Sequence, residues 1–172
     1  MPIIGFGTYK CKSVESLETA IVEVGYRHID TASLYENEEQ VGQAVASAIS
    51  KGAVTRDELF ITSKLWHTDY EDPEAAIKKT LERLNLPQID MYLIHWPLNY
   101  LGCEVKIPMY KIWAAMESLV DKGLTKAIGV SNFNLQLLCD MLTYARIRPA
   151  CNQIQIYPCH AQDELIQFMK KE

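Results

Sequence analysis

Six short apolar runs typical of β-strands alternate along the chain with longer segments whose apolar residues recur at helical spacing. The strands are predicted at residues 3–9, 26–30, 59–64, 91–95, 127–130 and 152–156, and a helix is predicted after each of them. Alternation of this kind is typical of α/β domains with a parallel sheet. Because no linker or low-complexity stretch interrupts the pattern, residues 1–172 are predicted to form a single domain of that class.

Three of the predicted helices begin at residues that favour helix N-termini. Asp72 precedes Pro73, and this pair is favourable in a first helical turn. Asn134 is predicted to cap the helix that follows the fifth strand. Asn37 is predicted to cap the helix that follows the second strand, with Gln40 in the position of a capping box. These signals indicate where the strand–helix units begin.

Two architectures fit a parallel sheet of this kind: an open doubly wound sheet and a closed (β/α)8 TIM barrel. A doubly wound sheet that binds dinucleotides is expected to carry Gly-x-Gly-x-x-Gly after its first strand. Residues 5–10 contain two glycines and overlap the first predicted strand. Polar residues at the ends of successive strands favour the barrel. Because a complete barrel takes about 250 residues, the chain is predicted to carry about six of the eight units, as one incomplete barrel domain.

Ionisable side chains stand at the C-terminal ends of three consecutive predicted strands. Asp30 ends the second strand, Lys64 the third and His95 the fourth. Because side chains alternate along a strand, these groups are predicted to share the face that points into the barrel and to meet at its mouth. Tyr35, in the loop after the second strand, is predicted to fold over them. His28 lies on the same face and is predicted to fill the barrel interior.

Together these groups are suited to proton transfer to a carbonyl oxygen. A free tyrosine has a pKa of about 10, and the ammonium of Lys64 is expected to lower the pKa of Tyr35. Asp30 is expected to keep Lys64 charged and in place. Tyr35 then serves as a general acid, while His95 orients the carbonyl by a hydrogen bond. Because protein side chains do not supply a hydride, the chemistry predicts a nicotinamide cofactor.

The order of these four residues resembles the catalytic tetrad of the aldo-keto reductases. Other segments that resemble the family, in the same order along the chain, are residues 5–9, 25–32, 63–66, 93–97, 126–133 and 152–154. The resemblance extends over residues 1–172 and is closest to the aldose reductase branch. It implies a (β/α)8 barrel that binds NADPH and reduces aldehydes or ketones to alcohols.

By position, the resemblance implies that Tyr35 is the proton donor and that His95 orients the carbonyl. Asp30 and Lys64 are implied to tune the proton donor. The residues implied to bind NADP are Gly7, Thr8, Tyr9, Lys10, Asp30, Ser131, Asn132 and Gln153. The residues implied to line the substrate pocket are Tyr9, Trp66, His95 and Trp96. Family members also contact the cofactor from a seventh and an eighth strand, which this sequence lacks.

The composition excludes several other classes of function. The formal net charge is −5, and the sequence has neither a basic cluster of the kind that binds nucleic acid nor an apolar run of membrane-spanning length. The absence of a secretory signal predicts a cytoplasmic protein. No spacing of Cys, His and Asp indicates a metal site, and the cysteines are predicted to be free thiols. The cysteines are Cys11, Cys103, Cys139, Cys151 and Cys159.

Two functions are compatible with these features. The first is an NADPH-dependent aldo-keto reductase that acts on a small carbonyl substrate. The second is a catalytically inactive barrel that serves as a binding or assembly module. If the chain ends at Glu172, its sheet has two unpaired edges, which favour self-association. The second function predicts an obligate oligomer or a partner subunit, whereas the first predicts turnover of the cofactor.

Overall fold

The structure is a computed structural model that describes residues 1–97 and 107–172. Parallel strands lie side by side in the order β1-β2-β3-β4-β5-β6, so each strand pairs with the next one along the chain. The strands are β1 (Phe6–Gly7), β2 (His28–Asp30), β3 (Phe60–Leu65), β4 (Ile89–Ile94), β5 (Thr125–Ser131) and β6 (Asn152–Gln153). This order confirms the predicted α/β class with a parallel sheet.

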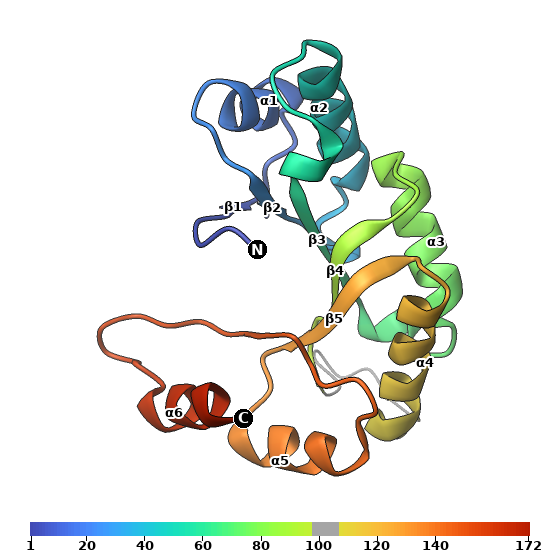
Figure 1. The fold of residues 1–172 in the computed structure, drawn as a ribbon, viewed down its shortest axis with the longest axis vertical. Coiled ribbons are helices and arrows are strands. Elements are labelled where there is room, and N and C mark those ends of the chain that lie inside the picture. The colour runs from blue at the N-terminus through green and yellow to red at the C-terminus, as the bar shows by residue number, and fades with distance from the viewer. Residues whose placement is uncertain (98–106) are drawn as a thin grey trace.

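Helices connect the strands, and the sheet is curled so that α1 to α5 follow its convex side (Figure 1). The helices are α1 (Val14–Val22), α2 (Glu38–Ser50), α3 (Pro73–Leu84), α4 (Met109–Asp121), α5 (Leu135–Tyr144) and α6 (Asp163–Lys171). Short 3-10 helices are η1 (Ser33–Tyr35), η2 (Arg56–Glu58) and η3 (His67–Asp69). The chain therefore forms part of a (β/α) barrel, with an open concave side.

The two outer strands are shorter than predicted. β1 and β6 pair with their single neighbours over two residues each, whereas residues 3–9 and 152–156 were expected to be extended. Ile3 and Ile4, at the start of the predicted first strand, are exposed and unpaired with the sheet. β4 begins two residues earlier than predicted and ends at Ile94, one residue before the predicted end, and it is buried along its whole length between β3 and β5.

The hydrophobic core lies between the convex face of the sheet and the helices. The residues that β2, β3, β4 and β5 contribute to it include alternating positions: Ile29, Ile61, Tyr92, Ile94, Ile128 and Val130. Because successive side chains of a strand point to opposite faces, the residues between these positions line the concave side. Asp30, Thr62 and Lys64 belong to this second set. The strand alternation thus determines which side chains are available for a site.

Two of the predicted helix caps are confirmed. The side chain of Asp72 accepts a hydrogen bond from the backbone N–H of Ala75 at 2.9 Å. The side chain of Asn134 accepts one from the backbone N–H of Leu137, also at 2.9 Å. Each satisfies a backbone donor that the first turn of a helix leaves unpaired.

Asn37 stands at the N-cap position of α2, as predicted, but the predicted side-chain cap and capping box are wrong. The side chain of Asn37 makes no hydrogen bond to the first turn of α2, and Oε1 of Gln40 is buried without a hydrogen-bond partner among the described residues. A capping box forms instead at η2, where the side chain of Glu58 accepts from the N–H and the hydroxyl of Thr55. The amide of Asn37 forms hydrogen bonds instead with Thr8, Cys11 and Thr31, which lie before α2 in the sequence.

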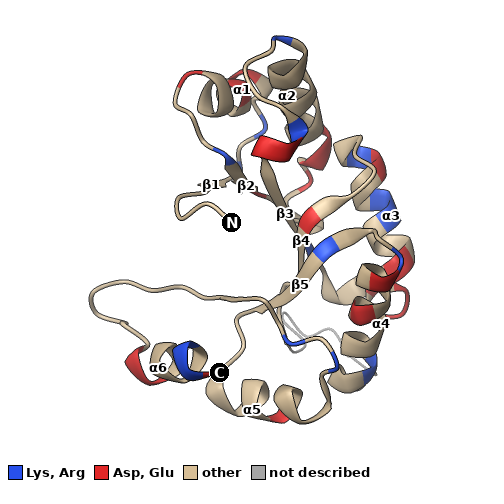
Figure 2. Ribbon diagram, viewed as in Figure 1, with Lys and Arg blue, Asp and Glu red and all other residues tan. Residues whose placement is uncertain are grey.

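Charged residues of both signs are distributed along the helices on the convex side (Figure 2). Asp90 differs from the exposed charged residues, because its side chain is buried in β4. It forms ion pairs with Arg56 at 2.7 Å and with Lys126 at 2.8 Å, and it accepts from the backbone N–H of Ile61 at 2.9 Å. These contacts join β3, β4 and β5 at the end of the sheet opposite Lys64.

In the part of the chain that the structure describes, no helix combines the length and the hydrophobicity needed to cross a membrane. Cys11, Cys139, Cys151 and Cys159 are free thiols, as predicted. Cys103 lies outside the described residues. Residues 1–97 and 107–172 contain no cluster of His, Cys, Asp and Glu side chains suited to hold a metal ion.

Candidate active site

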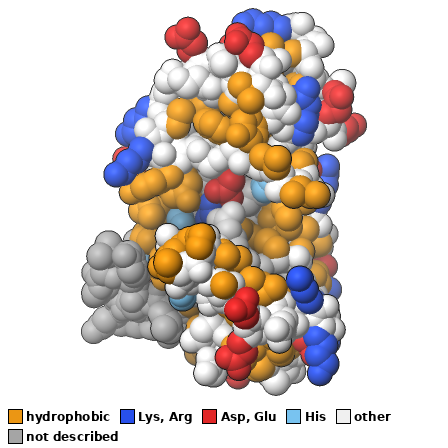
Figure 3. All heavy atoms as spheres, turned by 90° about the vertical axis from the view of Figure 1, so that its left-hand side faces the viewer, with side chains coloured by type: hydrophobic (Ala, Val, Ile, Leu, Met, Phe, Trp, Pro, Cys, Tyr) orange, Lys and Arg blue, Asp and Glu red, His pale blue; other side chains and the backbone are white. Residues whose placement is uncertain are grey.

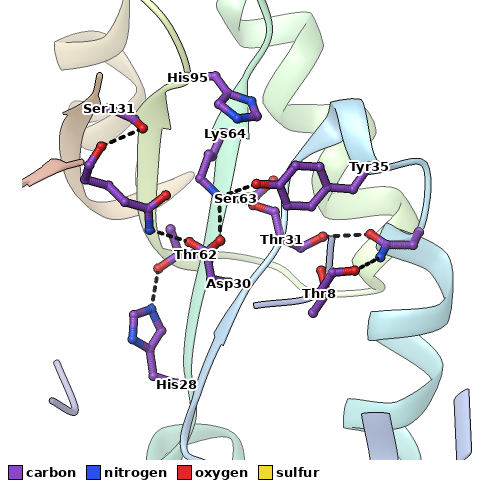
Figure 4. Close-up of polar contacts among 12 residues, drawn as sticks. Thr8, His28, Asp30, Thr31, Tyr35, Thr62, Ser63, Lys64, His95 and Ser131 are labelled. Carbon is purple, nitrogen blue, oxygen red and sulfur yellow. Dashed lines mark hydrogen bonds and ion pairs between the residues drawn. The ribbon is translucent and has the colours of Figure 1, made fainter. Parts of the chain in front are cut away.

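Lys64 lies at the centre of a buried polar cluster on the concave side of the sheet (Figure 4). Its Nζ donates to Oδ1 of Asp30 at 2.6 Å, to the carbonyl of Thr31 at 2.9 Å and to the phenol oxygen of Tyr35 at 3.4 Å. The side chain of Lys64 is 1% exposed and that of Asp30 is 15% exposed. Because an unpaired charge is costly to bury, this pairing restrains both side chains.

The register of β2 and β3 determines where Lys64 stands. Asp30 pairs with Thr62, so Lys64 lies two residues further along β3 on the same face, beyond the last residue of β2. The chain after β2 turns back through η1, which carries Tyr35. Oγ of Ser33 donates to the backbone carbonyl of Lys64 at 3.1 Å and holds η1 against β3. The phenol of Tyr35 is thereby brought over the ammonium.

Aromatic rings surround the phenol of Tyr35. His95, which directly follows β4, is edge-on to Tyr35, with ring centroids 5.7 Å apart. The ring of Tyr9 is tilted against Tyr35 at 5.1 Å, and Trp66 is edge-on to His95 at 5.1 Å. These rings form a largely apolar wall beside Lys64. Three of the four residues predicted to line a substrate pocket are thus brought together.

The fourth, Trp96, borders a neighbouring hollow. This hollow has a volume of about 640 Å³ and is also lined by Asn132 and Tyr157. The backbone carbonyl of Trp96 accepts a hydrogen bond from the hydroxyl of Tyr70. In the space-filling view, acidic, basic and histidine side chains lie at the bottom of the depression on the concave face, with hydrophobic side chains around them (Figure 3).

The pKa of Tyr35 is raised to about 12, so the prediction of a net lowered pKa is wrong for this structure. Burial of the phenol is the main cause, and the carboxylate of Asp30 and the phenol of Tyr9 add to it. Lys64 is 3.4 Å from the phenol but only 2.6 Å from Asp30, which offsets the positive charge of the ammonium. Tyr35 therefore keeps its proton throughout the neutral pH range.

The imidazole of His95 is neutral at pH 7. Burial lowers its pKa to about 4, and the positive charge of Lys64 contributes in the same direction. Burial also lowers the pKa of the Lys64 ammonium, while Asp30 opposes this effect. Nδ1 of His95 is buried and has no hydrogen-bond partner among the described residues. A neutral imidazole has one N–H donor, which is suited to a hydrogen bond with a carbonyl oxygen.

Polar side chains at the ends of β5 and β6 join the same network. Oγ of Ser131 donates to the backbone carbonyl of Gln153 at 2.9 Å, and Nδ2 of Asn132 donates to that of His95 at 2.9 Å. Asn132 has a backbone φ of 63°, in the left-handed region that asparagine tolerates better than most residues. Nε2 of Gln153 donates to Oδ2 of Asp30 at 2.8 Å. The residues predicted to hold a nicotinamide therefore lie beside the predicted catalytic residues.

Residues 7–10 reach the cluster from the end of β1. Gly7 pairs with Asp30, and the N–H of Thr8 donates to the carbonyl of Asp30 at 2.9 Å. Thr8 is fully buried, and its hydroxyl has no hydrogen-bond partner among the described residues. Lys10 has a φ of 63°, and its Nζ lies 5.3 Å from the ring centroid of Tyr9. This segment is in place to border a ligand beside Tyr35.

His28 lies deeper on the concave side and is half-buried. Its Nε2 is 3.0 Å from the hydroxyl of Thr62, and its ring is edge-on to Phe60 at 5.2 Å. Burial lowers the pKa of His28. These contacts agree with the predicted role of His28 as a filler of the barrel interior.

Sequence reasoning missed several contacts of the cluster. Thr31 contributes a backbone carbonyl, which no side-chain pattern can reveal. Ser33 acts through a hydroxyl whose partner is distant in the chain, and the same is true of the amide of Gln153. The sequence does place Ser33 two residues before Tyr35. That spacing indicates a contact between Ser33 and β3 only once the turn at η1 is known.

Comparison with known proteins shows to which family the chain belongs. A family model described as the aldo/keto reductase family matches residues 4–172. The chain belongs to the aldo-keto reductase family. Among curated relatives, aldo-keto reductase family 1 member A1 is 44% identical over 184 residues in Cricetulus griseus and 43% identical in Homo sapiens. In both cases the match covers 96% of this chain and 57% of the relative, so the chain spans little more than half of their length.

Solved structures give the same result for the fold. The aldose reductase from Schistosoma japonicum matches with a TM-score of 0.91 and 36% identity, over 99% of this chain and 62% of that one. An aldo-keto reductase (AKR2E5) complexed with NADPH matches with a TM-score of 0.93 and 37% identity, over 99% of this chain and 56% of that one. The curled sheet of this aldo-keto reductase chain is therefore the corresponding part of a (β/α)8 barrel, as predicted.

Proposed function

We propose that this aldo-keto reductase chain carries the catalytic residues for NADPH-dependent reduction of aldehydes or ketones to alcohols. The observation that carries the proposal is the buried contact of Lys64 with both Asp30 and Tyr35, beside the neutral imidazole of His95. A protonated phenol and an imidazole N–H are two donors that can converge on one carbonyl oxygen. The family assignment and the NADPH complex of a related structure support the same reaction class.

The polar residues beside the cluster fit a nicotinamide cofactor. A carboxamide group needs both donors and acceptors, and Ser131, Asn132 and Gln153 offer hydroxyl and amide groups of both kinds. The buried hydroxyl of Thr8, which has no partner among the described residues, is a further polar atom next to the site. When bound, a reduced nicotinamide supplies the hydride that no side chain can provide. We assign its binding to these residues together with Gly7, Tyr9, Lys10 and Asp30.

In the proposed reaction, Tyr35 gives its proton to the carbonyl oxygen as negative charge develops there. The phenol is protonated at neutral pH, which is the form required of a proton donor. Lys64 stabilises the developing phenolate by its positive charge, and Asp30 keeps the ammonium in place. His95 orients the carbonyl by a hydrogen bond. The rings of Tyr9 and Trp66 border the space in which an apolar substituent would lie, and Trp96 lines the neighbouring hollow.

The proposal is tested by following NADPH absorbance after addition of an aromatic aldehyde, such as 4-nitrobenzaldehyde, to the purified chain. We expect the cofactor to be consumed by the chain and by Tyr110→Phe, which removes an exposed phenol on α4. Tyr35→Phe should lower kcat by about a hundredfold or more while NADPH binding persists. Turnover that is unchanged in Tyr35→Phe, or a chain that neither binds nor oxidises NADPH or NADH, overturns the proposal.

A further inference from the structure

The side chain of Asn37 is fully buried and joins three segments of the chain. Nδ2 donates to the backbone carbonyl of Thr8 at 2.7 Å and to that of Cys11 at 2.9 Å. Oδ1 accepts a hydrogen bond from the hydroxyl of Thr31 at 3.0 Å. The amide is thus used by groups outside α2, although Asn37 occupies the N-cap position of that helix and could have capped it.

These bonds reach the neighbours of two groups that contact Tyr35, the ammonium of Lys64 and the ring of Tyr9. Thr31 is held by its hydroxyl to Asn37, and its backbone carbonyl accepts a hydrogen bond from Nζ of Lys64 at 2.9 Å. The carbonyls of Thr8 and Cys11, which accept from Nδ2 of Asn37, flank the turn that carries Tyr9. The ring of Tyr9 is packed against Tyr35 at 5.1 Å. One buried amide therefore connects the turn that carries Tyr9 with the residue that accepts from Lys64.

Asn37 is also close to Tyr35 along the chain. Only Glu36, which has a left-handed φ of 53°, separates the two residues. A turn with such a backbone depends on its surroundings to stay in place, because a non-glycine residue adopts this region at a cost. The hydrogen bonds of Asn37 fix one end of this turn, while the bond from Ser33 to the carbonyl of Lys64 fixes the other.

We propose that Asn37 is a positioning residue for the reaction: its amide sets the placement of the Tyr35 phenol over Lys64 by joining Thr31 to the turn at residues 8–11. The inference rests on the proposed reductase function, to which it adds a residue that contacts neither substrate nor cofactor. Its chemical basis is specific, because an amide offers two donors and one acceptor in a single plane. Three partners are satisfied at once by that geometry.

The test compares Asn37→Ala with a control at another helix start. Asp72→Ala removes the side-chain cap of α3, and among the described residues Asp72 has no hydrogen bond to the Tyr35 cluster. Thr31→Val is a second variant that deletes the hydroxyl bonded to Asn37 and keeps the carbonyl that accepts from Lys64. Each protein is checked for folding by circular dichroism. The readouts are kcat and KM for the aldehyde, the solvent isotope effect on kcat, and the NMR resonance of Tyr35 in protein labelled at tyrosine Cζ.

We expect Asn37→Ala to lower kcat by about tenfold or more, because small displacements of a reacting group slow proton transfer steeply. KM should change by less than about twofold, and the solvent isotope effect should rise as proton donation limits the rate. The Tyr35 resonance, assigned by its loss in Tyr35→Phe, should shift in Asn37→Ala and, by less, in Thr31→Val. Asp72→Ala should lower the melting temperature without any of these effects.

The positioning role of Asn37 and the proposed reductase function are overturned by different results. A folded Asn37→Ala or Thr31→Val with unchanged kcat and an unmoved Tyr35 resonance overturns the positioning role. If Asn37→Ala does not fold, Thr31→Val decides by the same readouts. A parent chain that neither binds nor oxidises NADPH or NADH overturns the proposed function alone, and the positioning role is then judged by the Tyr35 resonance, which needs no substrate.

Discussion

Nε2 of Gln153 donates a hydrogen bond to Oδ2 of Asp30 at 2.8 Å, although 123 positions separate the two residues in the sequence. Gln153 ends β6 and Asp30 ends β2, so the contact crosses the concave side between strands that are not neighbours in the sheet. The curl of the sheet is what brings them together. Asp30 accepts from Lys64 through its other oxygen and therefore links a proposed cofactor residue to the proposed catalytic lysine.

The first prediction concerns the Asp30–Lys64 pair, whose two members differ in exposure. Asp30→Asn leaves an ammonium that is 1% exposed without its counter-charge, and we expect a loss of about 3 kcal/mol in the free energy of unfolding. Lys64→Met leaves a carboxylate that is 15% exposed and still bonded to Gln153, and should cost less, about 1 kcal/mol. Urea unfolding at neutral pH measures both. Equal losses in the two variants contradict the argument.

The second prediction concerns the pH dependence of stability caused by His95. Its pKa is lowered from 6.5 to about 4, so the unfolded chain binds this proton more readily than the folded chain. The stabilisation is fully present above pH 6.5 and is lost as the pH falls toward 4. Between pH 7 and pH 5 the loss should be about 2 kcal/mol. Urea unfolding of the parent and of His95→Gln at both pH values isolates the contribution of His95. The loss of unfolding free energy between pH 7 and pH 5 should be smaller in the variant by this amount.

The sequence predicted the order and type of the strand–helix units because apolar periodicity is a local signal. The caps at Asp72 and Asn134 were also predicted correctly, since each side chain bonds to a backbone N–H three residues away. Asn37 carries the same local signal, but its amide is used by Thr8, Cys11 and Thr31. No local rule can separate these cases, because the competing partners become neighbours only when β1 and β2 pair.

The same limit applies to the site. Strand alternation was sufficient to predict that Asp30, Lys64 and His95 meet on one face. It could not predict the direction of the pKa shift of Tyr35, which depends on how deeply the phenol is buried and on how closely Asp30 offsets Lys64. Burial and distances are properties of the packed structure. The residue types in the sequence supplied only the candidates.

The third prediction follows from that pKa. In the chain without cofactor, Tyr35 should remain protonated at pH 10, because burial and the negative charge of Asp30 raise its pKa to about 12. The stability that this group contributes is complete below pH 10 and is lost as the pH rises from 10 to 12. Asp30→Asn should lower the pKa of Tyr35, since it removes the carboxylate. An NMR titration of tyrosine Cζ reports both values, and a midpoint below 10 in the parent chain contradicts the prediction.

The fourth prediction concerns the replacement of glycine by alanine at two strand positions, Gly129 and Gly7. A methyl group at Gly129 would lie 2.8 Å from the backbone carbonyl of Cys151 and 2.8 Å from a methyl of Leu93. The carbonyl belongs to the segment that leads into β6, so it can move only by displacing that strand from β5. Gly129→Ala is therefore expected to lower the free energy of unfolding by about 2 kcal/mol.

At Gly7, by contrast, a methyl group would meet no atom within 4 Å. Packing alone then predicts that Gly7→Ala leaves the melting temperature unchanged. If the proposed cofactor approaches the backbone here, as strand glycines often permit for ligands, the methyl group should weaken NADPH binding by about tenfold. Fluorescence titration of NADPH and thermal unfolding, applied to both variants, separate the two effects. Unchanged NADPH affinity in Gly7→Ala would exclude this residue from the proposed cofactor site, whereas a lowered melting temperature would show that its role is structural.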